Sequence, residues 1–206
     1  YPDPWKKTDV VGTRMPKVDA YERVSGTAVY PHDVALPEML HGAILRCPHA
    51  HARIVSIDTS EAATVPGVVR VVTGADLTSR FGLYMKDRFI FAQDRVRFVG
   101  EQVAAVIARD QKTAIRAAAL VRVEYEELPA VLEWDEAAAR EPLHAIDLTR
   151  GDSAAVLASA GTVVEATYST GHQEHIYIEC QGMVAHWEDE DQVVIHGSMQ
   201  CPYYVH

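Results

Sequence analysis

Three histidines, His41, His49 and His51, lie close together in the sequence and could act as metal ligands or bases. Imidazole is the commonest protein metal ligand and is suited to proton transfer near neutral pH. On an extended strand, His49 and His51 would project from the same side. However, a zinc site needs three or four converging ligands, and no acidic or cysteine side chain lies at a helpful spacing. We therefore interpret the three histidines as part of a polar loop packed against another domain, and keep a histidine-based zinc hydrolase as a lesser alternative.

Two further polar groups lie nearer the carboxyl end. His172 and His175 precede an alternating segment that would place them on opposite faces of a strand, so we interpret them as structural polar groups. Four successive carboxylates, residues 188–191, lie between two alternating runs at 181–187 and 192–196. We interpret the carboxylates as the solvated tip of a hairpin, because a cation site there would need ligands from elsewhere.

The cysteines argue against several classes of site. Cys47, Cys180 and Cys201 are widely spaced and form no Cys-x-x-Cys pair, so neither a disulfide framework nor a cysteine-bound zinc or iron–sulfur centre is expected. No nucleophile elbow, P-loop or dinucleotide-binding glycine motif occurs. The common signatures of acyl transfer and nucleotide chemistry are therefore absent.

Composition narrows the class further. The chain has 206 residues, is 48% hydrophobic and carries a formal charge of -10, which disfavours a nucleic-acid partner. No apolar run is long enough to span a membrane, and the first residues lack the apolar stretch of a secretory signal. These observations predict a cytoplasmic protein with no membrane or nucleic-acid partner.

The clearest secondary-structure pattern covers residues 102–125. Gln102–Ala108 is a short Val- and Ile-rich run, typical of a strand buried on both faces. Asp110 occupies an N-cap position before a helix with one apolar face, and an alternating strand follows from Val121 to Tyr125. This order predicts a right-handed crossover if the two strands are parallel and share a sheet.

The remaining elements are predicted from similar signals. Asp135 and Asp152 are expected N-caps, and Gly161 is expected to end the second of these helices in a left-handed conformation. Residues 1–26 are predicted to be an extended arm, 78–91 a loop and 144–149 an exposed linker at a domain boundary, with a helix starting at residue 201. We expect strands or a helical turn at residues 40–47, 54–57, 60–64, 68–72, 162–170 and 176–180, and the Asp152-capped helix at 153–160.

Several segments, in this order, resemble the start of the molybdopterin-binding subunit of the xanthine dehydrogenase and aldehyde oxidase family, which opens with an a/b hammerhead domain. The segment from Phe98 to Pro129 resembles that domain in its order of strand, helix and strand. The other resembling segments are residues 11–30, 41–54, 151–152 with 163–168, and 173–179 with 197–201.

The resemblance implies an α+β fold in three parts. Residues 1–19 would form the arm, 20–150 the hammerhead domain, and 151–206 the beginning of an incomplete molybdopterin-binding domain. It also implies that Gln200 approaches the molybdenum and donates its side-chain amide to a terminal oxygen there. From the residues alone, Gln200 would be an ordinary polar side chain at a strand end.

The family's activity would be hydroxylation of an aromatic heterocycle or aldehyde with oxygen from water, using a molybdenum–molybdopterin cofactor. Iron–sulfur clusters and FAD would belong to partner subunits or domains. The glycine-rich loop, the pterin-holding loops and the terminal glutamate of the family are absent from the 206 residues, so the rest of the subunit would be needed for activity. The alternative from another class is a non-catalytic interaction module without cofactor.

Overall fold

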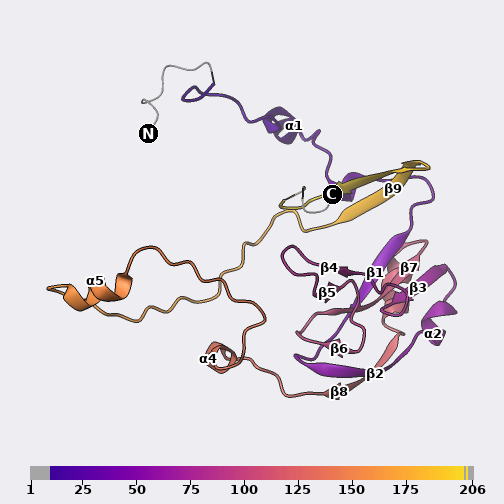
Figure 1. Ribbon diagram of the computed structural model, residues 1–206. Helices are drawn as coiled ribbons and strands as arrows, with labels where there is room; N and C mark the ends of the chain where they lie inside the picture. The colour runs from indigo at the N-terminus through magenta and orange to yellow at the C-terminus, as the bar shows by residue number, and fades with distance from the viewer. Residues whose placement is uncertain (1–9, 202, 204–206) are drawn as a thin grey trace. The chain divides into compact units, whose positions relative to one another are not determined.

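The computed structural model describes residues 10–201 and 203, and the chain divides into two units (Figure 1). The larger unit runs from Glu38 to His175, and the smaller one combines residues 1–37 with 176–206. Each is described by itself.

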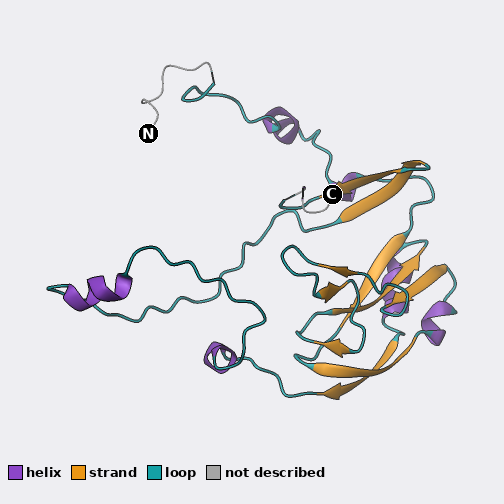
Figure 2. Cartoon of the chain, in the orientation of Figure 1, coloured by secondary structure: helices purple, strands orange, loops and turns teal. Residues whose placement is uncertain are grey.

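The first sheet of the larger unit is built around the predicted buried strand. This strand, β7 (Gln102–Ala108), pairs antiparallel with β1 (His41–Arg46) on one side and β3 (Val68–Thr73) on the other (Figure 2). Its central position explains the apolar run, because Val103, Ala104, Val106 and Ala108 are all fully buried.

A second three-stranded sheet has the order β6 (Arg95–Val96), β2 (Ala52–Asp58), β8 (Arg122–Glu127), again antiparallel. The helix-flanking strands β7 and β8 therefore belong to different sheets. The right-handed crossover was predicted only if the two strands were parallel and in one sheet. Since they lie in different sheets, no such crossover forms.

The predicted helix and its cap are confirmed. Helix α3 (Gln111–Ala118) begins after Asp110, whose carboxylate accepts the Thr113 backbone N–H at 2.8 Å. Ala114, Ala117 and Ala118 face inward, and the short helix α2 (Ser60–Ala63) adds Ala62 to the same core. Small alanine side chains at these positions let the helices approach the sheet closely.

The segment predicted as a loop contains two very short strands, β4 (Arg80–Phe81) and β5 (Arg88–Phe89), which pair antiparallel. The Arg80 guanidinium lies 4.7 Å from the centre of the Phe89 ring. This cation–π contact and the strand pairing give the segment more order than its irregular sequence indicates.

Two helical turns follow β8. Helix α4 (Trp134–Ala138) is preceded by Glu133 rather than by the expected cap Asp135, which lies inside its first turn. Helix α5 (Ser153–Ser159) has the predicted Asp152 cap, whose carboxylate accepts the Ala155 N–H at 2.9 Å.

The prediction for Gly161 is wrong. The helix ends through Ala160 in an extended conformation, so no left-handed residue is needed after it.

The smaller unit contains a short helix α1 (Ala20–Ser25), a 3-10 turn η1 (Pro31–Asp33) and a hairpin of β9 (Met183–Asp189) and β10 (Gln192–Gly197). Helix α1 shows that the predicted arm is not wholly extended. It ends at Gly26, whose φ of 74° is the left-handed conformation that suits glycine. Of the helix predicted to start at residue 201, position 202 and residues 204–206 lie outside the described residues.

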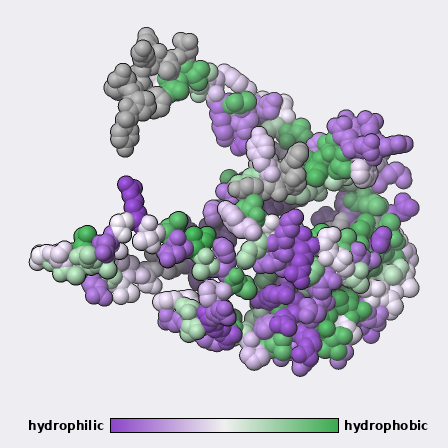
Figure 3. Space-filling view, viewed as in Figure 1, coloured by the Kyte–Doolittle hydropathy of each residue, from purple (hydrophilic) through white to green (hydrophobic). Residues whose placement is uncertain are grey.

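Apolar and hydrophilic side chains are interspersed over the visible surface (Figure 3). Among the described residues, no helix is both long and apolar enough to cross a bilayer.

Candidate functional site

The hairpin β9–β10 carries the chemistry-bearing residues of the smaller unit. Its strands pair antiparallel with His186 opposite Val194 and Val184 opposite His196. The acidic run lies where it was predicted, with Glu190 and Asp191 in the turn. The Gln192 side-chain amide donates to Glu188 Oε2 at 2.9 Å across this turn, so the tip is closed by local contacts.

Gly197 ends β10 in a crowded position. A Cβ there would lie 2.8 Å from Met199 Cε and 3.2 Å from Met183 Cγ. The next residue, Ser198, donates its backbone N–H to Gly182 O at 3.3 Å and so extends the pairing by one step. A glycine at 197 lets the two methionine side chains close over the strand end just before residue 200.

Gln200 lies three residues beyond β10 and is exposed. Within the part of the chain that the structure describes, its side-chain amide has no hydrogen-bond partner. The neutral amide can therefore donate to a group outside this chain without adding charge, which is the chemistry that the predicted cofactor role needs. In this respect Gln200 fits the place predicted for it beside a molybdenum–pterin group, and that role stays a prediction.

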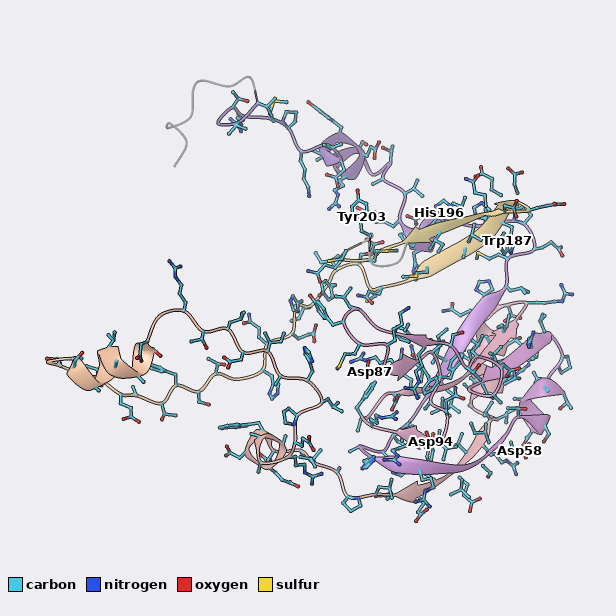
Figure 4. The ribbon with its side chains drawn as sticks, in the orientation of Figure 1. Asp58, Asp87, Asp94, Trp187, His196 and Tyr203 are labelled. Carbon is cyan, nitrogen blue, oxygen red and sulfur yellow. The ribbon has the colours of Figure 1, made fainter. Side chains whose placement is uncertain are left out.

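Sequence reasoning missed a histidine pair on the same hairpin. The rings of His186 and His196 stack with centroids 5.6 Å apart and planes 9° apart, and the Nδ1 of His186 is buried without a partner among the described residues. Figure 4 labels His196 and Trp187 on this hairpin. Regular alternation from a turn at residues 190–191 would pair position 186 with 195 and put 196 on the other face. The register shift between Gln192 and Val193 brings the two imidazoles to one face, and the sequence gives no signal for it. Trp187 lies on the opposite face and is exposed.

The segment before the hairpin is not a strand. Residues 162–170 and 176–180 were both predicted as strands, but the structure has no regular element from 160 to 182. An extended segment becomes a strand only when another strand takes its backbone hydrogen bonds, and none of the described residues does so here. His172 and His175 therefore do not flank a strand, and both are exposed.

The three histidines of the larger unit make separate contacts. His49 Nδ1 lies 3.2 Å from Glu127 Oε1, and His51 Nδ1 lies 2.8 Å from the carbonyl oxygen of Pro129. His41 lies in β1 and interacts electrostatically with Asp110. In the described ranges, 10–201 and 203, no three His, Cys, Asp or Glu residues are grouped so that they could hold a metal ion. The zinc alternative therefore gains no geometric support.

The structure has a larger mixed α/β unit and a smaller unit that carries the hairpin and Gln200. Residues 25–129 match the family model of the "aldehyde oxidase and xanthine dehydrogenase, a/b hammerhead domain", and residues 136–206 match that of the "molybdopterin cofactor-binding domain". The chain belongs to the aldehyde oxidase and xanthine dehydrogenase family.

Individual relatives agree with this assignment. The large molybdopterin subunit of nicotinate dehydrogenase from Eubacterium barkeri is 32% identical over 97% of this chain and 49% of its own length. The xanthine dehydrogenase/oxidase of Rattus norvegicus is 35% identical over 89% of this chain and 14% of its own length.

Solved structures show the same likeness. Quinoline 2-oxidoreductase from Pseudomonas putida matches with a TM-score of 0.81 and 34% identity, covering 97% of this chain and 28% of that one. Aldehyde oxidoreductase from Desulfovibrio gigas matches with a TM-score of 0.75 and 31% identity over 88% of this chain and 23% of that one. The chain thus spans about half or less of the proteins that it matches.

Proposed function

We propose that the chain provides the hammerhead domain and the first part of the cofactor-binding domain of a molybdenum-dependent hydroxylase. The substrate would be an aromatic heterocycle or an aldehyde, and the oxygen would come from water. The observation that carries the proposal is the succession of the two family matches, at residues 25–129 and 136–206, along one chain.

The division into parts follows the same proposal. Residues 1–19 would serve as an arm, 20–150 as the hammerhead domain and 151–206 as the opening of the cofactor-binding domain. The cofactor, when bound, supplies the redox chemistry of the hydroxylation. The rest of the molybdopterin-binding subunit would complete the pocket. Iron–sulfur and FAD subunits or domains would receive the electrons. The complex would be cytoplasmic.

Gln200 is the residue of this chain that we assign to the metal centre. Its exposed amide is free of partners among the described residues, and the match to the cofactor-binding domain includes its position. The crowded strand end at Gly197 lies three residues before Gln200, and the Gln200 amide nitrogen can donate a hydrogen bond. As a neutral donor it orients a ligand of the cofactor and leaves the charge of the site unchanged.

The test is to produce the chain together with the remainder of its subunit and its neighbouring subunits, and to measure bound molybdenum and pterin. We expect one molybdenum per assembled complex and incorporation of ¹⁸O from labelled water into the product. A complex that assembles fully but contains neither molybdenum nor pterin would refute the proposal and favour a non-catalytic interaction module.

The role of Gln200 is tested in the same complex. The variant Gln200→Ala should lower kcat by roughly 10- to 100-fold, the usual cost of losing a hydrogen bond beside a metal, with molybdenum content unchanged. Gln192→Ala, at the opposite end of β10, is the matched control and should retain activity. Equal activity of Gln200→Ala and the unmodified complex would contradict this assignment.

A further inference from the structure

His51 binds two consecutive residues beyond the end of the second sheet. The register of β2 and β8 stops at the pair Ala52 and Glu127. After this pair, the Leu128 N–H donates to His51 O at 2.9 Å, and the ring nitrogen Nδ1 of His51 lies 2.8 Å from Pro129 O. His51 thus contacts the two residues that follow the last paired residue of β8.

The partner of the His51 imidazole determines which of its ring nitrogens carries the proton. A carbonyl oxygen can only accept, so Nδ1 of His51 must be the donor in its contact with Pro129. His49 Nδ1 lies 3.2 Å from a Glu127 carboxylate oxygen, as an ion pair when the ring is protonated. The His51 ring is therefore held with the proton on Nδ1, since the hydrogen bond made by a histidine selects its tautomer.

The loop that presents these rings is anchored by buried contacts. Cys47 is 2% exposed, and its sulfur accepts the His49 backbone N–H at 3.3 Å. The His49 ring lies 5.0 Å from the Tyr125 ring, on the strand that ends at Glu127. Burial, and then a hydrogen bond with Cys47, raises the pKa of Tyr125, so its phenol stays protonated. Cys47 and Tyr125 thereby hold the loop against β8, next to the point where the imidazoles contact the end of that strand.

We propose that His49, His51, Glu127 and Pro129 form an exit clamp that fixes how the chain leaves the hammerhead domain. His51 is its positioning residue, because it holds both the amide of Leu128 and the carbonyl of Pro129. Pro129 has no N–H with which to continue the ladder, and its carbonyl accepts from the His51 side chain instead of from a backbone amide. The clamp also lies where the match to the first family model ends, at residue 129. The match to the second model begins at residue 136.

The first experiment measures the tautomers in the unmodified 206-residue chain. Side-chain ¹⁵N NMR at about pH 8, where free imidazole is neutral, should show His51 protonated on Nδ1. The Nε2–H form is the usual one for an unconstrained neutral ring. Finding His51 in that usual form would overturn the proposal without any substitution.

The second experiment uses two substitutions that place an amide donor differently. In His51→Asn the side-chain N–H lies near the position of Nδ1 and should keep the hydrogen bond to Pro129 O. In His51→Gln the amide lies one carbon further out and should lose that hydrogen bond. We expect amide exchange at Leu128 to be up to about tenfold faster in His51→Gln and nearly unchanged in His51→Asn, as for loss of one hydrogen bond.

Two comparisons complete this test. Exchange at Val106, in the buried strand β7, should not change in either variant, and His41→Asn should leave Leu128 unaffected because His41 lies in β1. Equal exchange at Leu128 in His51→Gln and the unmodified chain would refute the clamp. If His51→Gln also made amide exchange at Val106 faster, His51 would stabilise the core as a whole, and the proposal would equally fail.

Discussion

Asp110 accepts two hydrogen bonds from Thr113, from the backbone N–H at 2.8 Å and from the hydroxyl at 2.7 Å. The first satisfies an otherwise unpaired amide of the first turn of α3, and the second fixes the orientation of the carboxylate. Because α3 packs its alanine face on the first sheet, this small contact supports the placement of the whole helix.

Replacing Asp110 with Ala should lower the midpoint of thermal unfolding by a few degrees, since the cap is lost. The effect should depend on pH. The hydrogen bonds from the Thr113 backbone and hydroxyl lower the pKa of Asp110 below its ordinary value of 3.8. The cap therefore stabilises the fold fully above about pH 4 and its contribution is lost as the pH falls through the lowered pKa. If the difference in stability between the variant and the unmodified chain stayed constant as the pH fell below about 4, this account would be contradicted.

Val106 tests the core of the first sheet. It is fully buried in β7, opposite Ala43 on one side and Val71 on the other. Val106→Ala should reduce the free energy of unfolding by about 2–3 kcal/mol, measured by denaturant titration, because it removes buried methyl groups and leaves a cavity. Val69→Ala is the matched control, since Val69 is 52% exposed, and should change the stability by less than about 0.5 kcal/mol. Similar losses for the two variants would show that the sheet is not packed as described.

Gly197→Ala probes the strand end before Gln200. The new methyl group would meet the ends of Met199 and Met183, and the Met199 side chain can turn away because it is flexible. We expect the Met199 methyl and Gln200 amide signals to shift in NMR spectra, with a stability change below about 1 kcal/mol. Gly182→Ala is a suitable control, as no atom lies within 4 Å of the added carbon. Unchanged Met199 and Gln200 signals would contradict the described packing.

The ion pair between Arg122 and Glu61 should contribute little to stability. Its closest nitrogen and oxygen atoms are 2.6 Å apart, but the side chains are 75% and 48% exposed. Water and salt screen such pairs, so a double-mutant cycle to alanine should give a coupling energy below about 1 kcal/mol that shrinks at high salt. A larger, salt-insensitive coupling would show that the pair is shielded from solvent in solution.

Local signals were enough to predict much of the secondary structure. The apolar run at residues 102–108 became β7 because a strand in the middle of a sheet is buried on both faces. Asp110 and Asp152 became N-caps because a short carboxylate reaches an amide three residues ahead in any helix. The turn between β9 and β10 was predictable from the charges that mark its tip. The role of Gln200 stays a prediction from the family resemblance.

Other predictions failed where a partner distant in the sequence decides the outcome. Residues 162–170 and 176–180 have the alternation of strands, yet the described structure offers them no neighbouring strand. The same limitation applies to β7 and β8, which follow one another around α3 but enter different sheets. Alternation reports which faces are apolar, and it does not report which strand lies alongside.

By itself, the sequence determined the strand at 102–108, the Asp110 and Asp152 caps, the hairpin turn and the family, because these depend on residues within a few positions or on an ordered set of motifs. Only the tertiary structure decided that His51 meets Pro129, 78 positions along the chain, and that Glu61 meets Arg122, 61 positions along. Such pairs form because antiparallel pairing of β2 with β8 brings their ends together. Strand order is a global balance of packing and hydrogen bonding, which no short segment encodes.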